Sequence, residues 1–510
     1  MPHSKADVAD VLGRVDLGSS VAEHDDLLEA ARVETSVFSD LMADRVDLVP
    51  GTKGSGKSAL YRIFVDFLAP ALLKDRKVVI AHGVQSHGDS VFLAFQERFE
   101  TLTEDEFVDF WCVYLVSLAH TQFLKNPALR SYLGGCESEI DAFKRACFAA
   151  KIPDVEAPRS LRDVLEWVLN AVQRTKPHAA VTTPDGVKLE LGLFGDSSSQ
   201  MEQEEVAERQ LPTYIGAVKE TLEAILRKAD LALWLMVDRL DEIFPRRSAV
   251  ETRALRGLLR TLRVFESHQI RVKVFLRDDI LDQVTSGTEG FTALTHVTAR
   301  QAATLSWTED TILTLVVKRL FTSRALCELV EVEPTRLGAS RDYRAESFYR
   351  VFPKTVYSPP NQSDTLRWIY SHTIDGRGVV TPRDVIDLLT AAKQRQQDEF
   401  REDPLGESTW VIGSGAIRHG LAEMSKLKRD KVLRAELPHL WPYIEKFIGG
   451  KTEYSERAIL QLLGPRSQAT LADLVNIGLL SHSGPRGSSS TYKVPFLYRD
   501  GLELTRGRQD

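Results

Sequence analysis

Gly51-Thr52-Lys53-Gly54-Ser55-Gly56-Lys57-Ser58 is the stretch that decides the fold of this 510-residue chain. It matches the phosphate-binding pattern G-x-x-x-x-G-K-[ST] at every fixed position. The short apolar segment 46–49 before it is typical of a buried strand, and residues 58–68 after it have apolar side chains at helical spacing. Because such a loop joins a strand to a helix, the sequence predicts an α/β nucleotide-binding core.

The residue types of this loop suit the binding of a triphosphate. Glycines accept positive φ angles, so that successive backbone N–H groups converge on phosphate oxygens, and the helix N-terminus adds a partial positive charge. We expect Lys57 to reach the β- and γ-phosphates and the Ser58 hydroxyl to hold Mg²⁺. The predicted nucleotide-binding residues of the loop are Gly51, Thr52, Lys53, Gly54, Ser55, Gly56, Lys57 and Ser58.

A dinucleotide-binding loop is the first alternative. Gly54, Gly56 and Ala59 also fit the pattern G-x-G-x-x-A. A dinucleotide site requires an acidic residue at the end of the second strand. The second predicted strand, 77–83, ends in His-Gly without one, so we exclude this alternative.

A second apolar run supplies the expected metal partner. Residues 231–237 are apolar throughout, as in a central parallel strand, and Asp238 follows at the carboxyl end, where open α/β sheets bind ligands. We expect Asp238 to hold Mg²⁺ directly or through water. Glu242 is our first choice for the base that orients the attacking water, and Asp241 is the second. Neighbouring side chains face different directions, so the sequence leaves this choice open.

A third strand, predicted at 270–276, is followed by Arg277. A polar residue at this place senses the γ-phosphate in many ATPases, so Arg277 is predicted to contact the nucleotide of its own subunit or of a neighbour. The alternative is a surface ion pair of Arg277 with Asp278 or Asp279.

Together these motifs resemble the additional-strand P-loop NTPases, in the branch that includes STAND, KAP and AAA+ ATPases. Residues 237–242 are similar to the Asp-x-x-Asp-Glu motif of NACHT domains, although Arg239 stands where those domains usually have Gly. The resemblance implies ATP and Mg²⁺ as cofactors, and the chain has no N-K-x-D motif for guanine. Members of this branch often occur in bacterial phage-defence loci, which implies a role in antiviral defence.

The same resemblance assigns two further parts of a nucleotide site. Residues 17–23 and 305–307 would help to cover the adenine. The segment Thr381-Pro382-Arg383 begins a helix, with Thr as N-cap and Pro in the first turn. In AAA+-like ATPases the helical lid lends an arginine to the nucleotide, and Arg383 is the matching residue. The alternative is a surface arginine.

The predicted fold class is therefore α/β: a P-loop NTPase core, made of a parallel sheet with flanking helices, with a helical insert, a helical lid and a C-terminal winged-helix domain. In the winged helix we expect helices at 455–463 and 468–477 and strands at 479–483 and 492–498. The predicted ranges are 1–300 for the core, about 100–210 for an insert with a hairpin around residues 184–186, 301–400 for the lid, and 401–510 for the helical and winged-helix region.

Composition limits the partners and the compartment. The net charge of −7 gives no overall basic field, so any nucleic-acid contact has to be local, for example at the basic segment 426–434. The four cysteines form no C-x-x-C pair, which is typical of reduced core residues. The N-terminus lacks the apolar stretch of a signal peptide, and the apolar run 107–124 contains Asp109 and His120. We expect a cytoplasmic protein without membrane contact.

The main functional hypothesis is an ATP-driven conformational switch. Slow or partner-stimulated hydrolysis would move the lid and the winged helix and so signal to a protein partner or to further copies of the chain. One alternative is a DNA-binding ATPase resembling origin-recognition initiators. The other is a nucleotide-bound scaffold without turnover.

Overall fold

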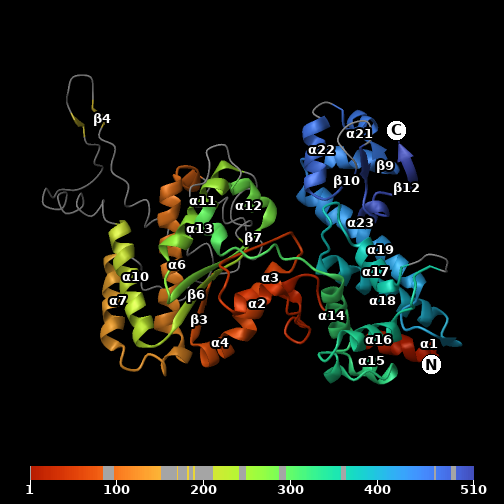
Figure 1. The fold of residues 1–510 in the computed structure, drawn as a ribbon, viewed down its shortest axis with the longest axis horizontal. Helices are drawn as coiled ribbons and strands as arrows, with labels where there is room; N and C mark the ends of the chain where they lie inside the picture. Colours follow the sequence, from red (N-terminus) through yellow and green to blue (C-terminus); the bar gives the residue numbers. More distant parts are fainter. Residues whose placement is uncertain are drawn as a thin grey trace. The chain divides into compact units, whose positions relative to one another are not determined.

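The computed structural model forms two compact units (Figure 1). One, which we call the sheet unit, contains Asp40–Gly51 and Leu60–Thr304. The other, the helical unit, contains Met1–Ser39, Thr52–Ala59 and Leu305–Asp510. Residues 52–58 of the phosphate-binding loop therefore cluster with the C-terminal half of the chain. The structure describes residues 2–83, 97–150, 169, 181–182, 188–189, 211–239, 248–285, 294–357, 363–464, 467–483 and 490–509.

A four-stranded parallel sheet is the centre of the sheet unit, as the sequence predicts for an α/β fold. Its strands lie in the order β2-β7-β6-β3, so β7 separates the strand before the phosphate loop from the strand before Asp238. Almost every residue of these strands is buried, which explains the continuous apolar sequence of β6. The strands are β2 (Leu48–Gly51), β3 (Val78–His82), β6 (Ala232–Val237) and β7 (Ile270–Arg277).

Helices cover this sheet. Helix α6 packs closely against α11, since a Cβ on Gly257 would lie 2.7 Å from the Cβ of Phe107, and the Trp111 indole donates a 2.7 Å hydrogen bond to Ala254 O. The helices are α2 (Ser36–Met42), α3 (Lys57–Arg62), η2 (Ile63–Leu68), α4 (Ala69–Arg76), α6 (Glu104–Lys125), η3 (Pro127–Leu129), α7 (Glu137–Ala149), α10 (Leu211–Lys228), α11 (Ala249–Val264), α12 (Asp278–Thr285) and α13 (Leu294–Ala299); α2 and α3 each cross a unit boundary.

The apolar run 107–124 lies in α6, which begins with a capping box between Thr103 and Glu106. Its large side chains are buried in the core of the sheet unit. Burial and the neighbouring acidic groups raise the pKa of Asp109 to about 6. Within the described part of the chain, none of the helices is both long enough and apolar enough to span a bilayer.

The predicted insert is described only in part. Strands β4 (Val181–Thr182) and β5 (Lys188–Leu189) pair antiparallel, as predicted for the hairpin. The polar segment 196–205 lies outside the described residues. All four cysteines are free and buried, two of them, Cys136 and Cys147, at either end of α7.

The helical unit joins the start of the chain to its second half. Strand β1 pairs antiparallel with β8, and the Lys393 ammonium on α18 donates to Val15 O at the end of α1. The elements are β1 (His3–Ser4), α1 (Lys5–Arg14), η1 (Ala22–His24), α14 (Glu309–Leu320), α15 (Arg324–Leu329), η5 (Pro334–Arg336), α16 (Arg341–Val351), α17 (Thr365–His372), α18 (Pro382–Glu402), β8 (Glu407–Ser408), α19 (Ser414–Lys428), η6 (Arg429–Arg434), α20 (Trp441–Ile444) and η7 (Glu445–Phe447).

The last part of the chain, which we call the C-terminal module, contains a four-stranded sheet in the order β10-β11-β9-β12. Both predicted helices are present. The predicted strand 492–498 is wrong beyond Lys493, because Pro495 has no N–H for a ladder and a short helix follows it. The elements are β9 (Lys451–Ser455), α21 (Glu456–Leu463), α22 (Ser467–Asn476), β10 (Ser481–Ser483), β11 (Thr491–Lys493), α23 (Phe496–Arg499) and β12 (Thr505–Gln509).

Candidate nucleotide-binding site

The phosphate-binding loop has the backbone that its glycines predict. Gly54 has φ 80° and Gly56 has φ 99°, both in the left-handed region that side chains disfavour. The loop curls back on itself, since Ser55 N donates to Thr52 O and the Lys57 ammonium donates to the same oxygen at 2.9 Å. Helix α3 begins at Lys57 and continues into η2 and α4, so Ser58 lies in its first turn.

Two hydroxyl groups in this loop are buried without a hydrogen-bond partner among the described residues. They are Thr52 Oγ1 and Ser55 Oγ, in residues that are 4% and 0% exposed. Leaving a buried hydroxyl unpaired costs about 1–3 kcal/mol. Polar oxygens of a ligand would remove this cost, and the loop therefore fits a phosphate group.

Trp307 packs against this loop. Its indole Nε1 donates a 2.7 Å hydrogen bond to Ser55 O. A Cβ placed on Gly56 would lie 3.6 Å from the Trp307 ring, so the ring is in contact with the backbone there. The sequence predicts that 305–307 covers the adenine. The contact observed is with the loop backbone, which the sequence gives no means of finding.

The N-terminus of α18 lies next to Gly54. A Cβ on Gly54 would be 3.4 Å from the Cβ of Arg383 and 3.5 Å from the Thr381 hydroxyl. The predicted cap is present, since Thr381 accepts from Asp384 N, with Pro382 in the first turn. Arg383 Nε donates to Ser20 O at 3.3 Å. Arg383 thus lies beside the loop rather than on a remote surface.

The N-terminal segment 17–23 is held in place by a buried ion pair. Arg319, on α14, donates to both carboxylate oxygens of Asp25, at 2.5 and 3.1 Å, and to Leu17 O at 2.6 Å. Gly18, with φ 72°, is required here because a Cβ would lie 2.2 Å from Asp25 Oδ1. Ser20 of the same segment contacts Arg383, so this segment, the loop and α18 meet within the helical unit. The sequence did not single out Asp25.

In the sheet unit, the carboxyl ends of the strands carry the other predicted residues. Gly51 pairs in register with Arg277, and Asp238 follows Val237 at the end of β6. Arg277 forms a bidentate ion pair with Asp279, at 2.9 and 2.7 Å. This pairing is the one that the alternative interpretation predicts, although Arg277 remains at the strand end. Asp241 and Glu242 lie outside the described residues.

Tyr61, a buried residue of α3, is not singled out by any sequence pattern. Its hydroxyl donates to Gly83 O at 3.3 Å, and its ring packs edge-on against Phe275. Burial, followed by the nearby Tyr114 and Asp238, raises the pKa of Tyr61. Tyr61 therefore stays a neutral hydrogen-bond donor close to the Asp238 carboxylate.

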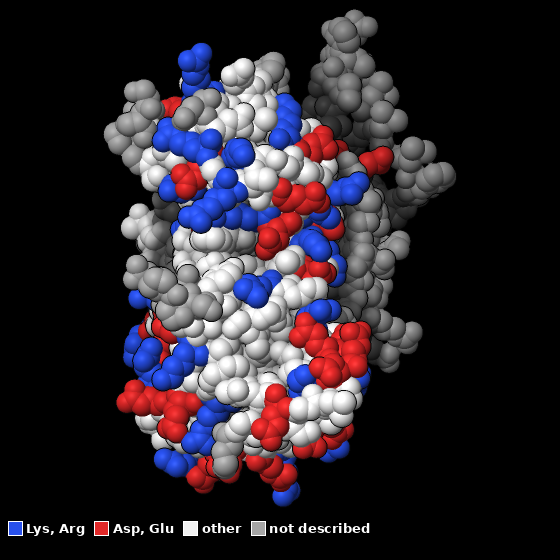
Figure 2. All heavy atoms as spheres, turned by 90° about the vertical axis from the view of Figure 1, so that its right-hand side faces the viewer, with Lys and Arg blue, Asp and Glu red and all other residues white. Residues whose placement is uncertain are grey.

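Ion pairs within the chain engage most of the basic segment 426–434. Lys426 pairs with Glu423, Lys428 with the buried Asp384, and Arg429 with Asp430 and Glu503. In Figure 2, basic and acidic side chains are interspersed over the visible face. In α22, Gln468 is exposed, and Arg466 lies outside the described residues.

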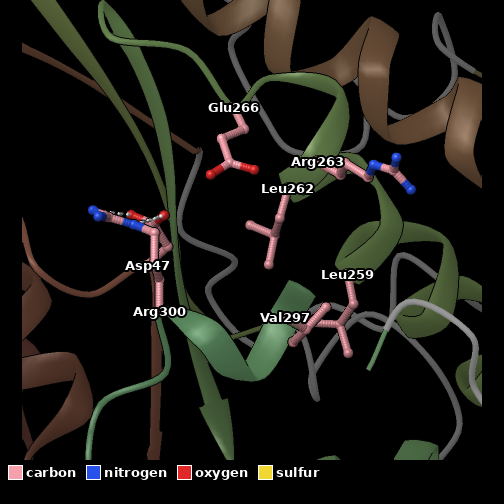
Figure 3. A pocket seen from close by; sticks show the side chains of 7 residues that line it. All are labelled: Asp47, Leu259, Leu262, Arg263, Glu266, Val297 and Arg300. Atoms are coloured by element: carbon pink, nitrogen blue, oxygen red, sulfur yellow. Dashed lines mark hydrogen bonds and ion pairs between the residues drawn. The ribbon is translucent and has the colours of Figure 1, made fainter. Parts of the chain in front are cut away.

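A hollow in the sheet unit lies at the amino ends of the strands, away from the predicted nucleotide edge (Figure 3). An ion pair between Asp47 and Arg300, 2.6 Å long, forms one wall. Asp44 and Asp47 both form ion pairs with Arg300. The same two aspartates also neutralise the fully buried Lys273 of β7. The residues that line the hollow are Asp47, Leu259, Leu262, Arg263, Glu266, Val297 and Arg300.

Comparison with known proteins adds two structural likenesses. No protein-family model and no curated protein match the sequence. A Walker-type ATPase of Pyrococcus abyssi aligns with 96% of this chain and 98% of its own, at 13% identity and a TM-score of 0.36. The Orc1 protein of Aeropyrum pernix, solved in complex with DNA, aligns with 99% of this chain and 92% of its own, at 13% identity and a TM-score of 0.32. At TM-scores this low, neither alignment carries an argument about the chain.

Proposed function

We propose that the chain binds ATP on the loop 51–58 and hydrolyses it slowly, as a conformational switch. The observation that carries the proposal is the loop itself. It combines Gly54 and Gly56 in left-handed conformations, two orphaned buried hydroxyls and Lys57 at the start of a helix. Backbone N–H groups in such a loop bind phosphate oxygens, and the ammonium of Lys57 would balance their charge.

The surroundings of the loop support a nucleotide rather than a free phosphate. Segment 17–23, Trp307 and Arg383 all belong to the unit that contains the loop, and each contacts the loop or a neighbour of it. In this proposal the Arg383 guanidinium binds the phosphates, and residues 17–23 contact the base. Mg²⁺ would neutralise phosphate charge, and Ser58 with Asp238 are the residues proposed to hold it.

We assign helices within 301–400 as the lid and the C-terminal module as a winged helix. The order β9-α21-α22-β10-β11, with residues 484–489 between the last two strands, supports the winged-helix assignment. The internal ion pairs of 426–434 give no reason to prefer DNA as its partner. A protein partner or another copy of the chain remains our choice.

The decisive test is nucleotide binding by the Lys57→Ala protein. We expect its affinity for a fluorescent ATP analogue with Mg²⁺ to fall at least about tenfold, because removing a charged partner of a phosphate costs more than about 1.4 kcal/mol. Lys74→Ala, an exposed lysine on α4, is the matched control and should bind as the wild type does. Unchanged affinity in the Lys57→Ala protein would reject the proposal.

A second measurement separates the switch from a scaffold without turnover. Wild-type protein should release phosphate from ATP, and Glu242→Gln should slow this release while ATP still binds, because the glutamine cannot accept a proton from water. If Asp241 is the base instead, Asp241→Asn gives that result. Phosphate release by the wild type at the level of the Lys57→Ala protein would favour the scaffold.

A further inference from the structure

Trp307 connects the phosphate-binding loop to helix α17. Its indole Nε1 donates to Ser55 O at 2.7 Å, and its own carbonyl accepts a 3.1 Å hydrogen bond from the Tyr370 hydroxyl. Tyr370 lies on α17, far along the chain from the loop. Two hydrogen bonds therefore suffice to join the loop backbone to this helix.

The peptide group at Ser55 makes this contact sensitive to a bound phosphate. Ser55 C=O and Gly56 N–H belong to the same peptide, which is planar. An N–H group of the loop that turns toward a phosphate oxygen therefore turns the carbonyl of its own peptide as well. The carbonyl in question is the one that holds the Trp307 indole.

The opposite end of the connection is an aromatic stack between α17 and the C-terminal module. The Trp368 and His372 rings on α17 stack with centroids 3.9 Å apart. His372 in turn lies 4.1 Å from the ring of Phe496, the first residue of α23. The Arg499 guanidinium covers the same Phe496 ring at 3.8 Å.

A backbone contact next to the stack fixes the same two parts to each other. Gly376 N, in the turn after α17, donates a 2.6 Å hydrogen bond to Gly478 O at the end of α22. No side chain fits at Gly376, since a Cβ would lie 2.3 Å from Leu480 O. Helix α17 has only eight residues, about 12 Å of helix, so a shift at Tyr370 moves Trp368 and His372 with it.

We propose that Trp307 positions the phosphate-binding loop and that, through Tyr370 and α17, it transmits the state of the loop to Phe496 in the C-terminal module. This proposal rests on the proposed function, because it needs a phosphate ligand on the loop. The coupling acts in both directions: if the nucleotide changes the packing at Phe496, a change in that packing alters the affinity for the nucleotide.

The first experiment changes Phe496 and measures ATP affinity. In Phe496→Ala full-length protein we expect the Kd for a fluorescent ATP analogue with Mg²⁺ to change about fivefold, the lower end of ordinary coupling. Ile448→Ala is the matched control, since Ile448 is equally exposed in the same region, 41% against 43%, and has no part in the stack. Phe496→Tyr keeps an aromatic ring and should restore the wild-type Kd.

If Phe496→Ala fails to fold, Phe496→Leu replaces it, since leucine keeps the apolar volume and removes only the stacking. A wild-type Kd in whichever of the two folds would overturn the proposal. A shift of the Kd that Phe496→Tyr does not reverse would also overturn it, because the effect would then not depend on the stack.

The second experiment follows the connection directly by hydrogen–deuterium exchange. Adding ATP and Mg²⁺ to wild-type protein should change the exchange of residues 365–372 and 491–499. Tyr370→Phe removes only the hydroxyl, so this variant should still bind ATP while the change at 491–499 disappears. A wild type that does not bind ATP refutes the proposed function itself. A wild type that binds ATP without any change at 491–499 refutes only the connection.

Discussion

Arg239 holds a left-handed backbone conformation, with φ 60°, directly after Asp238. A residue with a Cβ loses about 1–2 kcal/mol in this conformation, whereas glycine adopts it freely. The backbone therefore tolerates the arginine at a cost, in a segment beside the proposed metal-binding carboxylate.

The first prediction compares two variants that both remove the arginine side chain. Arg239→Gly should be more stable than Arg239→Ala by about 1 kcal/mol, the reverse of the usual order of these residues. Urea denaturation of both proteins measures the difference. Equal stabilities, or a more stable alanine variant, would show that the conformation at 239 carries no strain.

Other residue-level features lie beyond sequence reasoning for a common reason. The residue types of the phosphate-binding loop follow from the chemistry of phosphate. Gly54, Gly56 and Lys57 can therefore be identified as loop residues from the sequence pattern alone. Trp307 and Tyr61 act through contacts with residues at least twenty positions away. No local pattern encodes such a contact.

At the scale of elements, the first turn of α18 depends on a buried charge pair with α19. Asp384 accepts hydrogen bonds from the Thr381 hydroxyl and from the Lys428 ammonium, and both charged side chains are largely buried. In the sequence, Lys428 belongs to a basic run that suggests a solvated face or a nucleic-acid contact. In the structure, this lysine points inward and fixes the helix that carries Arg383.

The second prediction tests this pair. Lys428→Met should destabilise the protein by about 3–5 kcal/mol, because it leaves the Asp384 carboxylate buried without a cation. Lys426→Met breaks only an exposed pair with Glu423 and should leave the stability nearly unchanged. Both are measured by urea denaturation. The double variant Asp384→Asn with Lys428→Met should recover most of the loss, and a double variant as unstable as the single one would contradict this explanation.

The third prediction concerns pH and the contact between α17 and α23. Burial, with a smaller contribution from Arg499, lowers the pKa of His372 from 6.5 to about 4. The unfolded chain therefore binds a proton between these values while the folded one does not. The stability that depends on neutral His372 is complete above pH 6.5 and is lost as the pH falls toward 4. Denaturation at pH 7.5 and pH 5 should show a larger loss in wild type than in His372→Phe.

His372→Phe is informative because phenylalanine keeps the stack with Trp368 and Phe496 and cannot titrate. Carboxylates elsewhere contribute equally to both proteins, so only the difference between the two losses reports on His372. Equal losses in the two proteins would mean that the folded His372 takes up its proton as readily as the unfolded one.

Element boundaries follow the local sequence well where a single feature decides them. Thr381 and Pro382 mark the start of α18, and the apolar runs mark β6 and β7 to within a residue or two. The prediction for 492–498 fails because its apolar and aromatic residues suit a strand, yet Pro495 interrupts the ladder. The order of the strands depends on pairing between residues far apart in the chain, such as Leu48 of β2 with Val274 of β7, and no local pattern encodes it.

At the scale of the whole molecule, the loop 52–59 belongs to a unit assembled from three separate parts of the chain. The fourth prediction is that nucleotide stabilises this unit in particular. ATP with Mg²⁺ at a hundred times the Kd should add about 2.7 kcal/mol to its stability. Hydrogen exchange should slow at 305–320 and 381–389, while α7 serves as the internal reference. The Lys57→Ala protein should show no slowing, and slowing confined to α7 would contradict the prediction.

The discontinuity of the helical unit also governs how the protein is made. The first helix of the chain and the strand before it complete their packing only with residues near 393–408. During synthesis from the N-terminus, the sheet unit is finished at residue 304, before any of these partners has left the ribosome. Helix α1 therefore lacks these partners while the sheet unit folds, although its Val8 and Leu12 are fully buried in the complete fold. Chaperone dependence during translation should accordingly begin at this early helix and end when the segment around 400 emerges.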